Sequence, residues 1–184
     1  MEKAELTTVV KELDDMAMRM LQLMKEYIDV KSTLEELIKS GSLHLAKSRY
    51  IMGNRSVSAL QLPSEDSNEF TALVKVLSVK DPNDEVIFDL NRLSLSDLSK
   101  DVKSRQPKVK GESEETNNLD KNIQDPLKWF GVLVPQNMRQ AQSSFSKALE
   151  YVLQGTNLQL EMMRLKVNYD IKLKKKKELL DLNI

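Results

Sequence analysis

Apolar side chains recur at a helical period over the first 52 residues of the chain. Ten of them follow alternating steps of three and four without a break: Leu6, Val9, Leu13, Met16, Met20, Leu23, Tyr27, Val30, Leu34 and Leu37. This spacing is typical of the seam of a coiled coil, the row of side chains that faces a partner helix. Val10, Ala17, Met24 and Ile38 widen the stripe, so it is broad enough to face more than one helix.

The first helix is predicted over about residues 3–52. Gly41 falls on a seam position, where the register is expected to fail, because glycine costs roughly 1 kcal/mol against alanine in a helix interior. The helix then bends there or resumes in a new register through Leu45 and Tyr50. Gly53 is expected to end it.

A second, less regular helical pattern covers about residues 136–182. One apolar stripe comprises Phe145, Leu149, Val152, Leu160, Met163, Val167 and Ile171. A parallel row comprises Leu158, Met162, Leu165, Tyr169 and Leu173. The step of four from Thr156 to Leu160 indicates a stutter, which locally unwinds a left-handed supercoil. Two long helices that are each apolar on one stripe cover each other most simply as an antiparallel hairpin.

All five prolines lie between Pro63 and Pro135, which places irregular structure between the two helices. Residues 70–79 and 85–90 are rich in Val, Ile, Leu and Phe, and the turn at 80–84 separates them, so they predict a β-hairpin. Residues 94–99 are expected to form a short helical turn.

The predicted fold class is therefore mainly α. Two long helices form an antiparallel coiled-coil hairpin, with a small β-hairpin and a disordered excursion between them. Residues 100–124 are almost entirely polar, a composition that does not offset the entropy of ordering. The predicted organisation is a coiled-coil helix over 1–53, an irregular segment with the β-hairpin over 54–99, a disordered linker over 100–124, and a motif with the C-terminal helix over 125–184.

The stretch from residue 125 to residue 135 contains the only tryptophan of the chain. Asp125 suits a helix N-cap, Pro126 the first helical position and Gly131 a left-handed stop. One short helical turn is thus expected to present Leu127, Trp129 and Phe130. Two interpretations stay open, a hydrophobic plug onto the body of the protein and a docking surface, and they are not exclusive. Burial is the more common fate of such aromatic side chains.

Composition and charge narrow the possible functions. Lys plus Arg equals Asp plus Glu at 28 each, so net charge favours neither nucleic acid nor acidic lipid as a partner. The absence of cysteine excludes disulfides, thiol catalysis and cysteine-based zinc sites. No apolar run approaches the ~18 residues of a membrane span. The lysine run at 172–177 is interpreted as favourable charge at a helix C-terminus, with weak contact to anionic membrane as the alternative.

No catalytic constellation is evident, and we predict that the protein is not an enzyme. His44 is the only histidine, and acid–base catalysis needs an oriented partner for it. The phosphate-binding glycine motifs are missing, and the acidic pairs at 14–15 and 35–36 fall off the apolar seam. Neither a cofactor nor a metal site is predicted.

Two motifs together resemble one family. The first reads Asp125-Pro126-Leu127-x-Trp129-Phe130-Gly131-x-Leu133-Val134-Pro135, followed by Arg139-Gln140-Ala141-Gln142 and Phe145. The second reads Leu45-Ala46-Lys47-x-Arg49-Tyr50-x-Met52-Gly53, followed by Ser56-Val57. The pairing is similar to the small coiled-coil assembly factors of the vacuolar proton-pumping ATPase that occur in yeast and animals. The resemblance spans both terminal helices and their inner ends, and residues 60–124 lie outside it.

The resemblance implies a non-catalytic assembly factor that is peripheral on the cytosolic face of the endoplasmic reticulum. Its expected partners are a small membrane-anchored assembly partner and subunits of the membrane sector of the pump, with no nucleic acid and no membrane span of its own. The candidate motif or partner-binding residues are Arg49, Tyr50, Gly53, Asp125, Leu127, Trp129, Phe130, Gly131 and Pro135. Two other classes stay open: a prefoldin-like chaperone subunit, and a vesicle-tethering or cytoskeletal coiled-coil adaptor.

Overall fold

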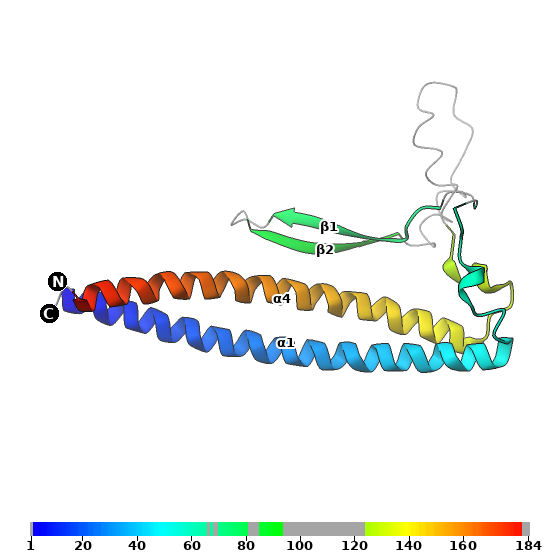
Figure 1. Cartoon of the computed structure of the whole chain (residues 1–184), viewed down its shortest axis with the longest axis horizontal. Helices are drawn as coiled ribbons and strands as arrows, with labels where there is room; N and C mark the ends of the chain where they lie inside the picture. The colour runs from blue at the N-terminus through cyan, green and yellow to red at the C-terminus, as the bar shows by residue number, and fades with distance from the viewer. Residues whose placement is uncertain (1, 66, 68–69, 81–84, 94–123, 182–184) are drawn as a thin grey trace, which may run out of the picture. The chain divides into compact units, whose positions relative to one another are not determined.

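The computed structural model describes residues 2–65, 67, 70–80, 85–93 and 124–181. Its elements are, in order, α1 (Glu2–Met52), a 3-10 turn η1 (Ala59–Gln61), strands β1 (Val74–Lys80) and β2 (Val86–Arg92), a 3-10 turn η3 (Pro126–Phe130) and α4 (Gln136–Asp181) (Figure 1). The strands pair into a two-stranded sheet, and the Leu93 N–H donates to the Leu73 carbonyl at its base. The predicted fold class is confirmed. The predicted helical turn at 94–99, most of the turn at 80–84 and all but the last residue of the predicted disordered linker lie outside the described residues.

The chain divides into two compact units. Unit 1 contains Met1–Glu36, Lys80–Ile87 and Ala148–Ile184, and unit 2 contains Leu37–Val79 and Phe88–Lys147. In both units the described residues of α1 and α4 run antiparallel, side by side (Figure 1). No helix in the described part of the chain is long and apolar enough to cross a membrane.

The ten predicted seam positions of α1 are all buried or half-buried. In unit 1, Leu23 and Val30 of α1 form a core cluster with Leu158 of α4. Three of the four positions that were expected to widen the stripe, Ala17, Met24 and Ile38, are exposed instead. The seam that α4 covers is therefore narrow, and part of the apolar surface of α1 faces solvent.

The expected failure of the register at Gly41 is wrong. Gly41 is buried within an unbroken helix, and a Cβ built on it would lie 2.9 Å from ring atoms of Phe145. The next two seam positions are His44, half-buried, and Ser48, fully buried. The Ser48 hydroxyl donates to the His44 carbonyl at 2.9 Å, and His44 Nδ1 lies 3.2 Å from Asn137 Oδ1. The repeat therefore continues through small and polar side chains, and at Gly41 the missing side chain leaves the space that the ring of Phe145 occupies.

The stripe predicted for α4 is also largely wrong. Six of its seven members are exposed: Phe145, Leu149, Val152, Met163, Val167 and Ile171. One row of buried and half-buried side chains, which includes every buried residue of α4 from Ala141 onward, instead keeps alternating steps of three and four without a stutter, at positions 141, 144, 148, 151, 155, 158, 162, 165, 169, 172, 176 and 179. Ala141, Ala148 and Gly155 occupy three of these positions, so much of the seam is small rather than strongly apolar. The parallel row that starts at Leu158 is the part of the prediction that faces α1.

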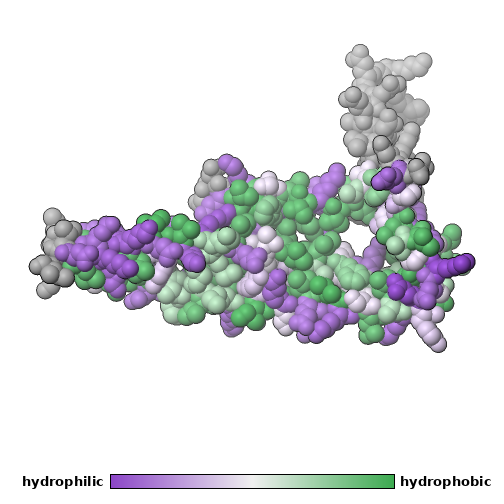
Figure 2. All heavy atoms as spheres, viewed as in Figure 1, coloured by the Kyte–Doolittle hydropathy of each residue, from purple (hydrophilic) through white to green (hydrophobic). Residues whose placement is uncertain are grey.

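Ion pairs close one edge of the helix pair in unit 1. Arg19 Nη2 lies 2.7 Å from Glu161 Oε1, Lys175 Nζ lies 2.7 Å from Glu5 Oε1, and Lys172 pairs with Glu12. The hydrogen bond and charge of Lys175 lower the pKa of Glu5 below its ordinary value, so this contact stabilises the fold near neutral pH and is lost as acid protonates Glu5. Part of the lysine run is thus explained by interhelical pairing, and Figure 2 shows hydrophilic side chains gathered over these last turns of α4.

Two arginines attach the β-hairpin to α4. In unit 1, Arg164 Nη1 lies 2.6 Å from Glu85 Oε2, and its other terminal nitrogen donates to the Val86 carbonyl. In unit 2, Arg92 donates to the Ser146 carbonyl. An isolated two-stranded hairpin is marginal in water, and these contacts with the helix supply the support that it needs.

Substitution by alanine is expected to have opposite effects on stability at the two helical glycines of the seam, Gly41 and Gly155. A Cβ on Gly155 would meet Val30 Cγ1 at an ordinary 3.5 Å, whereas one on Gly41 would overlap Phe145. Gly155→Ala should therefore gain up to ~1 kcal/mol of helix propensity, and Gly41→Ala should lose most of that gain or destabilise. Urea unfolding measures both, and the difference should shrink in a Phe145→Ala background. Equal effects in the native background would show that the ring swings aside freely.

Candidate docking site around residues 125–135

The turn η3 is built as its sequence predicts. Asp125 Oδ1 accepts the N–H of Leu127 at 3.0 Å and also accepts Gln142 Nε2 at 3.0 Å. Pro126 opens the turn. Gly131 ends it with a φ of 124°, and its N–H donates to the Lys128 carbonyl at 3.2 Å. Asp125 therefore caps η3 through the Leu127 N–H and links it to the second turn of α4 through Gln142.

Leu127 is the plug of this motif. Its side chain is 9% exposed and belongs to a core cluster with Val57 and Met138. Phe130 and Val134 pack against the same cluster from their own segment. Leu45 and Met52 do so from the end of α1, so the two motifs of the family resemblance meet around one core. The contribution of Val57 was missed as a site feature, although it stands in the second motif.

Trp129 makes a different contact. Its ring meets that of Phe70 edge to face, with centroids 5.5 Å apart and planes at 72°. Such pairs contribute about 0.5–1.5 kcal/mol beyond the area they bury. The two rings share the lining of a hollow of about 270 Å³ with Gln61, Leu62, Pro63, Ser67 and Gln124. Trp129 is half-buried and Phe70 is exposed, so this pair forms part of the surface.

Two hydrogen bonds to backbone carbonyls fix the end of α1. Arg49 Nε donates to the Val57 carbonyl at 3.1 Å, which is the carbonyl-capping role that arginine often takes. Gly53 has a φ of 86°, and its N–H donates to the Arg49 carbonyl at 2.9 Å, so it ends the helix as predicted. Tyr50 is 92% exposed, which corrects the expectation that the seam resumes through it.

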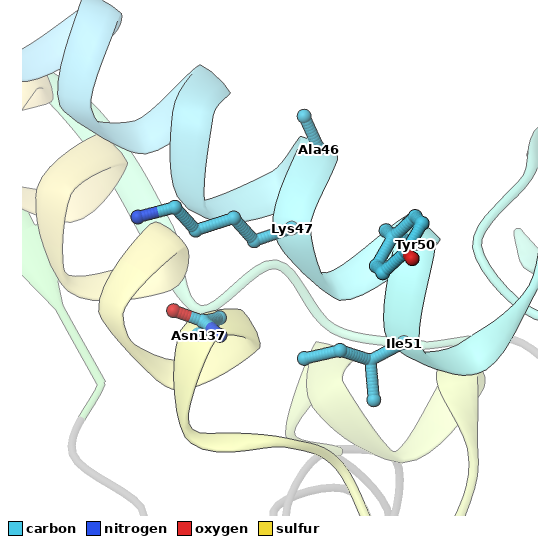
Figure 3. Close-up of a pocket in the computed structure, with 5 residues that line it drawn as sticks. All are labelled: Ala46, Lys47, Tyr50, Ile51 and Asn137. Carbon is cyan, nitrogen blue, oxygen red and sulfur yellow. The ribbon is translucent and has the colours of Figure 1, made fainter.

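A second hollow, of about 380 Å³, lies beside the last turns of α1. It is lined by Ala46, Lys47, Tyr50, Ile51 and Asn137, the last from the first turn of α4 (Figure 3). Its lining carries one cation and no carboxylate. The hollow thus offers apolar contact next to a single positive charge.

The most exposed apolar side chains of the motif follow Gly131. Val132 is 95% exposed and Leu133 is 90% exposed. Pro135 then precedes α4, where its carbonyl accepts the Met138 N–H at 3.0 Å. The candidate list from the sequence omitted Val132 and Leu133, yet their position between a glycine and a proline was the signal for a short exposed loop. Such side chains gain from burial only when another molecule covers them.

The described residues offer surfaces for binding. Among them, no group of three or more His, Asp or Glu side chains is placed to hold a metal ion. His44 contacts Asn137 in the helix pair. What the site provides is a fixed core, an aromatic pair at the surface and an exposed apolar loop.

Comparison with known proteins decides the family. The family model described as Vma22/CCDC115 matches residues 14–148, more than half of the chain. The chain belongs to the Vma22/CCDC115 family. Curated relatives include the vacuolar ATPase assembly protein VMA22 of Danio rerio, 27% identical over 90% of both chains. Proteins of the same name from Mus musculus and Homo sapiens are 32% and 29% identical, over 80% of this chain and 82% of theirs.

The range that matches the Vma22/CCDC115 model contains both sequence motifs and most of α1. It ends at Ala148, where the part of α4 that belongs to unit 1 begins. The resemblance drawn from the two motifs is therefore confirmed at the level of the family.

Proposed function

We propose that the chain is a non-catalytic assembly factor of the vacuolar proton-pumping ATPase. The observation that carries the proposal is membership of a family whose curated relatives in fish and mammals are named vacuolar ATPase assembly proteins. An assembly factor acts by binding and release. It therefore needs apolar anchors whose burial is incomplete in the free protein.

The finer part of the proposal concerns where the chain acts and on what. It assists the membrane-embedded, proton-translocating sector of the pump, at the cytosolic face of the endoplasmic reticulum, and a small membrane-anchored protein holds it there. These statements follow the family resemblance of the two motifs.

Unit 2 offers the surface for this binding. Val132 and Leu133 project from a loop that is fixed at both ends, by Gly131 on η3 and by Val134 in the core cluster. Because the loop ends are already held, docking costs little ordering of the chain. Leu127 and Phe130 act indirectly, by holding the loop in place.

The two rival classes share the architecture but not the family. A prefoldin-like subunit also combines two coiled-coil helices with β-structure, and a tethering adaptor needs only the helices. Family membership favours the assembly factor. The three differ in what they bind, so identification of bound proteins separates them.

The proposal is tested in cells from which the chain is deleted. We expect loss of acidification of the vacuole, measured with a pH-sensitive dye, and loss of the assembled pump on native gels, with both restored by the intact chain. Affinity purification from detergent-solubilised membranes should recover a membrane-sector subunit and a small membrane protein. Normal pump assembly in deleted cells would overturn the function, and recovery of prefoldin subunits or tethering factors would replace it.

Localisation has its own test. In cells that lack the small membrane-anchored protein, the chain is expected to move from the membrane fraction to the soluble fraction. Continued sedimentation with endoplasmic reticulum membranes would instead show direct binding to lipid.

A further inference from the structure

The two edges of the helix pair in unit 1 differ in chemistry. Along one edge of the pair lie the α1 residues that directly precede a seam residue in the sequence. Three of them, Glu5, Glu12 and Arg19, form ion pairs with α4. Along the other edge lie the residues that directly follow a seam residue in the sequence. On α1 it is apolar through Ala17, Leu21, Met24 and Ile28, all exposed. One side of the pair is therefore closed by charge, and the other is open and apolar.

The open edge has a symmetric pattern. Between Asp14 and Lys31 the row runs Asp14, Ala17, Leu21, Met24, Ile28 and Lys31, in steps of three, four, three, four and three. The sequence of steps reads the same in both directions. A helix carrying such a row can lie antiparallel to an identical helix with every member of the row opposite another member.

The pairs that this arrangement creates are complementary. Asp14 meets Lys31 of the second copy, so opposite charges face each other at both ends of the row. Ala17 meets Ile28, a small side chain against a large one, and Leu21 meets Met24 at the centre. An isologous two-fold contact makes each of these pairs twice. Opposite charges across such a contact fix its register, whereas like charges would oppose it.

The neighbouring surface of α4 leaves room for the contact. A hollow of about 350 Å³ lies along the open edge, lined by Met20, Gln159, Met162, Met163 and Lys166. Gln159 and Lys166 follow the seam positions Leu158 and Leu165, so they belong to the edge opposite the ion pairs. Three of the five lining residues are methionines, which adapt to the shape of an inserted side chain.

We propose that two copies of this chain associate through this row, with α1 antiparallel to α1 about a two-fold axis between Leu21 and Met24. A helix from a different protein would need an apolar stripe but no palindromic row with opposite charges at its ends. The self-complementary pattern therefore favours a second copy as the occupant. The contact involves unit 1 and leaves the exposed loop of unit 2 available.

The first test uses the purified full-length chain in sedimentation equilibrium across a concentration series. The native chain is expected to show a monomer–dimer equilibrium. Leu21→Asp should abolish the dimer, because it places a carboxylate in the centre of the apolar contact. Met18→Asp is the matched control: Met18 is 60% exposed and Leu21 is 62% exposed, but Met18 lies outside the row. Circular dichroism should show unchanged helix in both variants.

The second test is a charge exchange. Asp14→Lys or Lys31→Asp alone turns two attractive pairs into two repulsive ones and should raise the dimer dissociation constant about tenfold. The double variant Asp14→Lys/Lys31→Asp should restore the native value. Lys31 also lies 5.2 Å from the centroid of the Tyr27 ring. That contact is lost both in Lys31→Asp and in the double variant, so it cannot produce the recovery of the double variant relative to Lys31→Asp.

Three results would overturn the inference. One is a chain that stays monomeric throughout the concentration series, even if a helix of another protein later proves to cover the row. Another is a dimer that survives Leu21→Asp. The third is a double charge variant that dimerises no better than the single variants, because the proposed register requires the two charges to meet.

Discussion

Truncation of Leu127 to alanine is expected to lower the free energy of unfolding of unit 2 by about 2–4 kcal/mol. The side chain is 9% exposed and belongs to the cluster that joins η3, α4 and the segment after α1. Urea unfolding followed by the fluorescence of Trp129 measures the change, since the only tryptophan of the chain lies two residues away.

Leu133→Ala is the matched control for this measurement. It removes the same atoms from a leucine that is 90% exposed, so the expected change is within about 0.5 kcal/mol. The difference between the two variants isolates the contribution of burial. If both substitutions cost the same, the cluster around Leu127 would not be the core of unit 2.

The sequence predicted those parts of the fold that rest on strong local signals. The ten-position stripe of α1 has one side chain per turn that is large and apolar, and every member packs as expected. The turn η3 follows from Asp125, Pro126 and Gly131, whose conformational preferences act within a few residues. Such signals need no knowledge of the distant segments that later pack against them.

The seam beyond Leu37 could not be predicted in the same way. Gly41 looked like a break because a glycine in a helix is unfavourable in isolation. The structure retains it because Phe145, far away in sequence, comes so close that even one methyl group would overlap its ring. Ser48 is fully buried, yet its hydroxyl is satisfied within its own helix. A hydropathy pattern predicts neither the close contact between Gly41 and Phe145 nor the hydrogen bond of the Ser48 hydroxyl.

In α4 the same limitation put one of the two predicted apolar rows on the seam, although most of its side chains are exposed. Ala141, Ala148 and Gly155 are buried on the seam, while larger residues such as Val152 and Met163 are exposed. At Gly155, an added Cβ would already lie 3.5 Å from Val30 of α1. A hydrophobicity pattern favours the larger side chains. A face that is more apolar than the seam itself is also the kind of feature that indicates a binding surface.

At the candidate site, the sequence could not separate the buried residues of the motif from the exposed ones. Leu127 and Phe130 pack in the core, Trp129 pairs with Phe70 at the surface, and Tyr50 faces solvent. A buried plug and an exposed loop are thus adjacent parts of one motif. The exposed part, Val132 and Leu133, carries the next prediction.

The double substitution Val132→Asp/Leu133→Asp is expected to leave the fold intact and to abolish assembly of the proton pump. Both side chains are more than nine-tenths solvent-exposed, so each change should alter stability by no more than about 0.5 kcal/mol. In a bound complex the same positions would place two carboxylates in an apolar contact, at a cost of several kcal/mol. Complementation of deleted cells, read as acidification, together with urea unfolding of the purified variant, measures the two effects separately.

Val76→Asp provides the control, because Val76 is an exposed valine of unit 2 on β1 rather than in the loop. It should complement fully, which would show that added negative charge on unit 2 is harmless in itself. A loop variant that folds and still supports assembly would move the anchor elsewhere, to the Trp129–Phe70 pair or to the hollow beside Tyr50. A loop variant that fails to fold would instead show that Val132 and Leu133 are covered within the chain, which their exposure argues against. Normal folding with lost assembly is the only outcome in which the loop is the part of the motif that meets the partner.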